Sequence, residues 1–314
     1  MRIVFMGTPD YAVPTLASLF ESGHEVVAVF AQPDKLVGRK RVLTAPPTKS
    51  YALEQGIPVF QPTTLRDGEA LDILKGLAPD LIVVVAYGKL LPNEILTLPR
   101  LGCINGHASL LPKYRGASPI QWCIVCGERE TGVTVMQMDE GMDTGDILQM
   151  QKVAIGENET AEELFERLSV LTADLVLDTA EKLQNGAVVP TKQPSENVSY
   201  APILKKEMAE LDFNKTANEL HNAIRGYYSW PCAFFFRNGK RVKVLKSLLR
   251  SQTTSKAPGT VVENNGELSV ACGEGTVLSL EVLQAEGSRA MTAEEFLRGH
   301  ALSVGEVITG EENG

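Results

Sequence analysis

Two short apolar runs constrain the fold more than any other feature of the chain. Leu81–Ala86 is rich in β-branched residues, and Arg2–Met6 is a second run of the same kind. Apolar runs without polar alternation are typical of parallel strands that are buried on both faces. We therefore expect both segments to be strands, with Leu81–Ala86 in the centre of a sheet.

The segments after the first run predict a doubly wound α/β fold. A helical pattern with Leu16 and Leu19 ends near Gly23, and Glu25–Ala31 is a second predicted strand. Strand, helix and strand in this order form the βαβ unit of a mostly parallel, Rossmann-like sheet. The intervening turn, Gly7–Asp10, is not a G-x-G-x-x-G, so a nicotinamide or flavin cofactor has little support.

The pattern changes after residue 190. Pro190–Tyr200 is a polar connector, and short apolar segments separated by turns follow it. Such spacing is typical of a small β-barrel. We predict a catalytic domain over residues 1–189, a linker over 190–206 and an OB-like β-barrel domain over 207–314. The predicted strands of the last domain are Phe234–Phe236, Val242–Leu245, Gly259–Val262, Glu267–Cys272 and Thr276–Val282.

Two polar side chains follow the short predicted strand Gly102–Ile104. Asn105 and His107 stand in a segment punctuated by Gly and Pro that reaches Pro119. They would lie at the carboxyl edge of the sheet, where open α/β sheets build ligand sites. An amide and an imidazole can donate hydrogen bonds to a carbonyl oxygen that gains negative charge. The alternatives are a structural histidine and an asparagine that caps a turn.

A carboxylate cluster follows at Asp139, Asp143 and Asp146. One of these carboxylates could fix the tautomer of His107 and stabilise its protonated form, and the residues alone leave the choice among the three open. The spacing lacks the twelve-residue calcium pattern with its terminal Glu, so we expect no metal. No Ser or Cys of these segments has the context of an activated nucleophile. The pattern therefore favours direct acyl transfer to an amine, without a covalent enzyme intermediate.

Charge is distributed unevenly along the chain. The net charge is −9, yet residues 201–250 hold ten Lys and Arg against four Asp and Glu. Residues 32–49 are also basic, and their prolines and glycine predict a loop without regular structure. That loop is either a solvated surface or an arm that contacts a phosphate backbone. The asymmetry indicates a surface for a polyanion on an otherwise acidic protein.

Composition and cysteine use indicate a cytoplasmic protein. The chain has 314 residues with five scattered cysteines, which favours reduced thiols. We expect no signal peptide at Met1–Met6, and no apolar run reaches the roughly 18 residues of a membrane helix. Cys123 and Cys126 form a C-x-x-C without a second pair, so chance spacing is favoured over zinc. Trp230 could stack on a base, although core packing is the favoured reading.

These motifs together carry a resemblance to a known family. The matching segments are Gly7–Asp10, Gln32–Asp34, Val84–Gly88, Asn105–Pro112, Arg115–Ile120, Glu130–Thr134 and Asp143–Asp146. The chain resembles the methionyl-tRNA formyltransferase family from end to end. The Ser-Leu-Leu-Pro segment after Asn105 and His107 is shared by enzymes that use 10-formyltetrahydrofolate.

The resemblance implies a reaction and a set of site residues. The formyl group of 10-formyltetrahydrofolate would pass to the α-amine of initiator methionyl-tRNA, with no metal, in a monomer that starts translation. Asn105, His107 and Asp143 would be the catalytic trio. Ser109, Leu110, Leu111 and Pro112 would line the folate site. The expected tRNA-binding residues are Arg39, Lys40, Arg41, Lys205, Lys206, Arg237, Lys240, Arg241 and Lys243.

The sequence departs from the family pattern at two places, and it leaves alternative functions to be considered. Gly106 replaces a larger apolar residue and could loosen the trio, and the loop around Leu36 and Lys40 differs from the usual sequence. The rival is another enzyme that uses 10-formyltetrahydrofolate, either a sugar N-formyltransferase or a formyl-folate hydrolase. The alternative from a different class is a catalytically silent module that binds a nucleic acid or a nucleotide.

Overall fold

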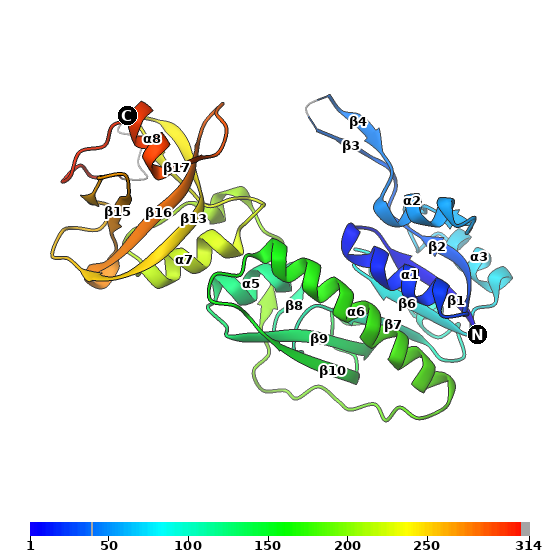
Figure 1. The fold of residues 1–314 in the computed structure, drawn as a ribbon. Helices are drawn as coiled ribbons and strands as arrows, with labels where there is room; N and C mark the ends of the chain where they lie inside the picture. The colour runs from blue at the N-terminus through cyan, green and yellow to red at the C-terminus, as the bar shows by residue number, and fades with distance from the viewer. Residues whose placement is uncertain (39, 309–314) are drawn as a thin grey trace. The chain divides into compact units, whose positions relative to one another are not determined.

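The computed structural model describes residues 1–38 and 40–308, which divide into two compact units (Figure 1). Of the described residues, the first unit contains 1–38, 40–119, 130–154 and 165–202, and the second contains 120–129, 155–164 and 203–308. Among the described residues, no helix has the length and apolar character that a membrane span requires.

The first unit is built on a seven-stranded mixed sheet. Its strand order is β10-β9-β7-β6-β1-β2-β5. The five strands from β7 to β5 are parallel, whereas β9 pairs antiparallel with β7 and with β10. The strands are β1 (Arg2–Gly7), β2 (Glu25–Phe30), β5 (Val59–Phe60), β6 (Leu81–Val85), β7 (Cys103–His107), β9 (Glu130–Gln137) and β10 (Ile147–Ala154). The prediction of a mostly parallel, Rossmann-like sheet is confirmed, with an antiparallel pair at one edge.

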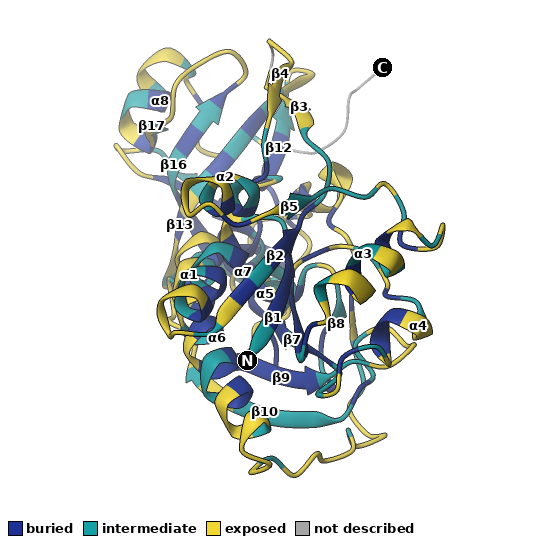
Figure 2. Ribbon diagram, turned by 90° about the vertical axis from the view of Figure 1, so that its right-hand side faces the viewer, coloured by how far each residue is buried: buried dark blue, intermediate teal, exposed yellow. Residues whose placement is uncertain are grey.

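The central strand β6 is buried on both faces, as its composition predicts. It lies between β7 and β1 and pairs parallel with both. The unit's helices are α1 (Val13–Glu21), α2 (Pro47–Glu54), α3 (Glu69–Leu77), α4 (Asn93–Leu96) and most of α6 (Ala161–Gln184), with a 3₁₀ turn, η1, at Asp10–Ala12. α1 and α6 cover one face of the sheet, and α3 and α4 cover the other (Figure 2).

Residues 32–49 contain a hairpin, so the prediction of an irregular loop was wrong. Strands β3 (Lys35–Val37) and β4 (Val42–Thr44) pair antiparallel, with Leu36 opposite Leu43. The prolines lie outside the two strands, and Gly38 supplies the positive φ of 72° that a tight turn needs. The short β-branched and leucine segments on either side of that turn were the missed signal.

The second unit carries a six-stranded antiparallel sheet. Its main order is β12-β13-β16-β15-β14, and β17 pairs with β16. The strands are β12 (Phe234–Arg237), β13 (Lys240–Thr253), β14 (Val261–Glu263), β15 (Leu268–Ala271), β16 (Thr276–Ala285) and β17 (Met291–Thr292). The helices are α5 (Pro119–Val125), α7 (Ala217–Gly226), α8 (Ala293–Gly299) and the 3₁₀ turns η2 (Lys206–Ala209) and η3 (Gly273–Gly275). Leu220 and Ile224 of α7 pack with Phe235, Leu278 and Leu280 of the sheet in one core.

Two expectations for this unit were wrong in detail. β13 is fourteen residues long and passes three irregularities in its pairing with β16, whereas the sequence predicted only Val242–Leu245. Each irregularity shifts the inward-facing register, so the apolar alternation is lost along the strand. Trp230 is 52% exposed instead of packing in the core, while its neighbour Tyr227 is buried.

Gly106, within strand β7, allows helix α6 to pack closely against the sheet. Its neighbours along the strand face α3 and α4, so position 106 faces α6. A Cβ at Gly106 would lie 2.6 Å from the Thr172 Cγ2 and 3.0 Å from the Val176 Cγ2. Thr172 is fully buried and its hydroxyl lies 2.7 Å from the Tyr11 hydroxyl. Helix α6 therefore occupies the space of the missing side chain.

We predict that Gly106→Ala lowers the free energy of unfolding by about 1–3 kcal/mol, because the new methyl overpacks against α6. Urea denaturation measures the change. Adding Thr172→Ser should restore most of the loss, since it removes the nearest methyl group and keeps the hydroxyl beside Tyr11. Gly76→Ala, in an open position of α3, is the control and should be neutral or stabilising. A Gly106→Ala protein as stable as the wild type would refute the packing argument.

Candidate active site

Strand β7 places Asn105 and His107 on one face of the sheet. Side chains two residues apart on a strand point the same way, so the two share a face with Cys103. Cys103 packs in the core that includes Leu74 of α3 and Ile95 of α4. The strand itself runs through His107 and pairs with β9 at Thr134, so both polar residues lie within regular structure rather than in a following loop.

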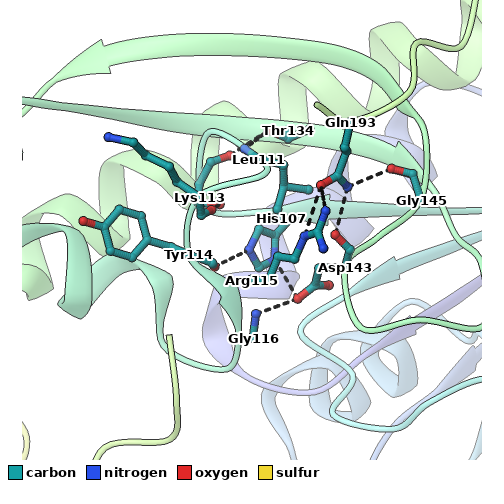
Figure 3. A network of polar contacts seen from close by, with 11 residues as sticks. His107, Leu111, Lys113, Tyr114, Arg115, Gly116, Thr134, Asp143, Gly145 and Gln193 are labelled. Carbon is teal, nitrogen blue, oxygen red and sulfur yellow. Dashed lines mark hydrogen bonds and ion pairs between the residues drawn. The ribbon is translucent and has the colours of Figure 1, made fainter. Parts of the chain in front are cut away.

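The His107 ring is held by a backbone carbonyl (Figure 3). His107 is 6% exposed, and its Nε2 lies 2.9 Å from the Tyr114 carbonyl oxygen. A carbonyl can only accept a hydrogen bond, so Nε2 carries a proton and donates it. Nδ1 is therefore the ring atom that faces Asp143 and the rest of the site.

Asp143 is the carboxylate that reaches His107. Its Oδ2 lies 3.8 Å from His107 Nδ1 and accepts a 2.7 Å hydrogen bond from the Gly116 backbone N–H. Asp139 instead accepts hydrogen bonds from Gly141 and Thr144 within its own loop. The separation from His107 is too long for a hydrogen bond, yet it is short enough for an ion pair once the imidazole is charged.

Asn105 offers a free amide beside His107. Within residues 1–38 and 40–308, no hydrogen-bond partner is found for its side chain, which is partly exposed. Because no protein group accepts a hydrogen bond from this amide, it can donate to a ligand oxygen without breaking an existing hydrogen bond. Asn105 and His107 thus provide donors on one face of β7, with a carboxylate opposite the imidazole.

The segment Ser109–Pro112 forms a tight turn against β9. The Ser109 hydroxyl donates to the Lys113 carbonyl at 2.7 Å, and Thr134 Oγ1 donates to the Ser109 carbonyl at 2.7 Å. The Leu111 N–H donates to Thr134 Oγ1 at 3.2 Å. Ser109, Leu111 and Pro112 are buried, whereas Leu110 is partly exposed. Leu110 is the member of this segment with side-chain surface left for a ligand.

Arg115 and Gln193 also belong to the site, and sequence reasoning did not assign either a role. Gln193 accepts hydrogen bonds from the Arg115 guanidinium and donates to backbone carbonyls of the Asp143 loop (Figure 3). Arg115 stood in a matching motif, which was a usable signal. Gln193 lies in the predicted linker, where nothing in the sequence distinguishes it from other polar residues.

A second polar cluster lies after β2. Lys49 Nζ contacts both Asp34 carboxylate oxygens at 2.8 and 2.9 Å, and Gln61 Nε2 donates to the same group at 2.8 Å. The hydrogen bond from Lys49, followed by that from Gln61, lowers the pKa of Asp34 below its ordinary value. Lys49 is thus neutralised internally, and the exposed positive charge of residues 32–49 lies on the β3–β4 hairpin.

The predicted polyanion-binding residues lie in both units. Lys40 and Arg41 are exposed at the tip of the β3–β4 hairpin, and Arg39 lies outside the described residues. Lys205, Lys206 and Lys240 are exposed in the second unit. The remaining three are partly buried: Arg241 lies 4.0 Å above the Phe234 ring, Arg237 donates to the Ala301 carbonyl, and Lys243 lies on β13. In the described part of the chain, no cluster of His, Cys, Asp and Glu could hold a metal ion.

Comparison with known proteins identifies relatives over the whole chain. The formyl transferase family model matches residues 1–179, and the model of the formyl transferase C-terminal domain matches residues 203–301. The methionyl-tRNA formyltransferase of Caldanaerobacter subterraneus subsp. tengcongensis is 48% identical over 98% of this chain and 100% of its own length. That of Myxococcus xanthus is 48% identical over 97% and 96%. The resemblance predicted from the motifs is confirmed.

Solved structures share the fold at lower identity. An N-formyltransferase from Helicobacter canadensis, in complex with folinic acid and dTDP-3-aminofucose, has a TM-score of 0.69 at 22% identity, covering 90% of this chain and 98% of its own. The sugar 3N-formyl transferase WlaRD has a TM-score of 0.68 at 20% identity, covering 92% and 99%. At these identities the similarity shows the fold.

We predict that neutral His107 carries its proton on Nε2, because the Tyr114 carbonyl can only accept. Long-range ¹H–¹⁵N correlation spectra of the imidazole measure this, with the signal assigned by its loss in His107→Gln. His300 is the internal comparison: its Nδ1 lies 3.3 Å from the Phe296 carbonyl, which favours the opposite tautomer. A proton on Nδ1 of neutral His107 would contradict the observed geometry.

Proposed function

The chain belongs to the formyl transferase family, and from this premise we propose that it transfers the formyl group of 10-formyltetrahydrofolate to the α-amino group of initiator methionyl-tRNA. The products are N-formylmethionyl-tRNA and tetrahydrofolate. The observation that carries the proposal is the set of two donors and one carboxylate at β7, in a chain whose full-length relatives are named for this reaction.

The proposed chemistry is direct acyl transfer. The neutral α-amine of methionyl-tRNA attacks the formyl carbon on N10 of the folate, and negative charge develops on the formyl oxygen. Asn105 and His107 in its protonated form hydrogen-bond this oxygen, and the Asp143 carboxylate stabilises the imidazolium. Because Nε2 donates to Tyr114, the donor of His107 is Nδ1. The amine's proton passes to the leaving N10 through a water near Asp143.

The 3.8 Å gap between His107 and Asp143 is compatible with this role. His107 Nδ1 donates its hydrogen bond to the formyl oxygen, so Asp143 acts on the imidazolium through its charge, and an ion pair at this distance needs no direct hydrogen bond. Ser109, Leu110, Leu111 and Pro112 would form one wall of the folate site, with Leu110 in direct contact. Solved structures of the same fold were determined in complex with folates, the Helicobacter canadensis enzyme with folinic acid and HypX from Aquifex aeolicus with tetrahydrofolic acid, which supports this expectation.

Two basic surfaces would bind tRNA. The β3–β4 hairpin, with Arg39, Lys40 and Arg41, would contact the acceptor end. The antiparallel sheet of the second unit would close as an OB-like barrel whose basic residues neutralise backbone phosphates. Exposed Trp230 is available to stack on a base. In this proposal residues 1–189 carry the catalytic side chains and residues 207–314 bind tRNA. Residues 190–206 link the two domains and also contribute Gln193 to the site, and the chain would act as a cytoplasmic monomer.

An acceptor assay distinguishes this function from its rivals. The protein is incubated with 10-formyltetrahydrofolate and methionyl-tRNA, a dTDP-amino sugar or no acceptor, and formyl products are identified by mass spectrometry. Formyl-methionine on tRNA supports the proposal. A formylated sugar would support the first rival, and formate released without an acceptor would support the hydrolase. The basic hairpin favours tRNA, because a small acceptor needs no such surface.

We predict that Asn105→Ala and His107→Ala each reduce kcat by about a hundredfold or more, because each removes a donor to the developing oxyanion. Steady-state formylation of methionyl-tRNA measures the loss. Asn185→Ala, at the exposed end of α6, is the matched control and should retain full turnover. Near-normal turnover of either site variant would refute its catalytic role.

We also predict that the apparent KM for methionyl-tRNA rises steeply with salt, whereas the KM for the folate barely changes. Lys and Arg contacts to phosphates release counterions, which makes binding salt-dependent. Lys240→Ala should reduce the slope of log KM against log salt by about one. Lys256→Ala, an exposed lysine outside the predicted set, should leave the slope unchanged. Equal salt sensitivity for both substrates would count against the basic surfaces.

A further inference from the structure

The connector over residues 191–201 is bound to both segments that build the candidate active site. Thr191 exchanges two backbone hydrogen bonds with Ile147, at 2.7 and 2.8 Å. At its other end β11 (Tyr200–Ala201) pairs parallel with β8 (Arg115–Gly116), and the Arg115 N–H donates to the Ser199 carbonyl at 2.9 Å. The connector therefore joins the end of the Asp143 loop to the segment that follows Tyr114.

Gln193 makes the central contact of this connector. Its Nε2 donates to the backbone carbonyls of Asp143 and Gly145, both at 2.8 Å. Its Oε1 accepts from Arg115 Nη2 at 2.6 Å and Nε at 3.2 Å. Carbonyls only accept and a guanidinium only donates, so the carboxamide fits in one orientation. Neither a carboxylate nor a hydrocarbon can replace it in all four contacts.

These contacts form a closed network of hydrogen bonds that includes the Asp143 backbone and carboxylate. Arg115 holds Gln193, Gln193 holds the Asp143 backbone, and the Asp143 side chain accepts from the backbone N–H of Gly116, the residue next to Arg115. Gln193, Arg115 and Asp143 are all partly buried. The backbone and the carboxylate of Asp143 are thus anchored to the same two-residue strand.

The Asp143 backbone needs such an anchor because its conformation is uncommon. Asp143 has a φ of 55°, in the left-handed region that residues other than glycine seldom adopt. Without Gln193 the Asp143 loop would lose two of the hydrogen bonds that hold this conformation, and the carboxylate would be less firmly held opposite His107. A shift on the order of 1 Å in a catalytic group can cost about a hundredfold in rate.

We propose that Gln193 is a positioning residue for formyl transfer, acting through the backbone of Asp143 to hold its carboxylate opposite His107 Nδ1. The inference rests on the proposed function. It predicts an effect on turnover rather than on substrate binding, since the four hydrogen bonds of the Gln193 carboxamide already engage it with Arg115 and the Asp143 loop. A residue that merely fastened the connector would change stability and leave turnover of the folded protein intact.

The decisive variant is Gln193→Glu. It keeps size and improves the charge pairing with Arg115, but it turns a carboxylate oxygen toward the carbonyls of Asp143 and Gly145. Glu196→Gln is the matched control: it makes the reverse exchange three residues along the same connector, at an exposed side chain. Gln193→Ala removes both sets of contacts without adding charge, and serves if the glutamate variant does not fold.

Kinetics of methionyl-tRNA formylation and thermal denaturation are measured for all four proteins. We expect kcat of Gln193→Glu to fall on the order of tenfold or more, with both KM values within about twofold and the thermal midpoint well above the assay temperature. Glu196→Gln should match the wild type. Gln193→Ala should also lose kcat, because the Asp143 backbone is released.

Two results would overturn the inference. One is a kcat within about twofold of the wild type for both Gln193 variants. The other is a loss that appears only in KM, or that vanishes when rates are compared per folded molecule. If the wild type itself forms no formyl-methionine on tRNA, the proposed function fails. If the wild type is active and both Gln193 variants equal it, only the positioning role fails.

Discussion

The two-residue period of strand β7 is the constraint on which the candidate site depends. It sends Asn105 and His107 to one face of the sheet and Gly106 to the other. On that other face α6 approaches so closely that Thr172 occupies the space of a side chain at position 106. The glycine that departs from the family pattern is therefore explained by helix packing. The same approach fixes the strand that carries both donors.

Backbone groups, more than side chains, orient the reactive residues. The Tyr114 carbonyl selects the tautomer of His107, and the Gly116 N–H holds the Asp143 carboxylate. Both donor and acceptor belong to the segment that pairs with β11 of the connector. Backbone groups of paired strands move little. They can therefore hold catalytic side chains in position to stabilise the charge that develops in the transition state, without a rearrangement of the site. The connector thus contributes to the geometry of the site.

The surfaces that would bind tRNA differ from the rest of the protein in the sign of their charge. The net charge is −9, yet exposed cations gather at the tip of the β3–β4 hairpin and around β12 and β13. Lys49 and Arg237 do not add to these surfaces in full, because Asp34 and Glu306 pair with them. Local charge, and not the average over the chain, therefore decides which partner the protein can attract.

Local patterns were enough to predict much of this protein. The apolar run at Leu81–Ala86 predicted a buried central strand, and the predicted strand before Asn105 and His107 placed both residues at the carboxyl edge of the sheet. These features depend on strand periodicity and on where parallel strands end, which the order of residues determines. The β3–β4 hairpin and the full length of β13 were missed, since turn glycines and shifts in register interrupt the alternation that reveals a strand.

The tertiary structure alone decided which of three nearby carboxylates reaches the imidazole and which ring nitrogen faces it. It also decided that Gln193, fifty residues beyond Asp143, holds the loop that carries that carboxylate. Contacts between residues so far apart along the chain arise from packing and hydrogen bonds to backbone groups, which have no sequence signature. The residue types present are therefore a property of the sequence, while their orientation toward one another is a property of the fold.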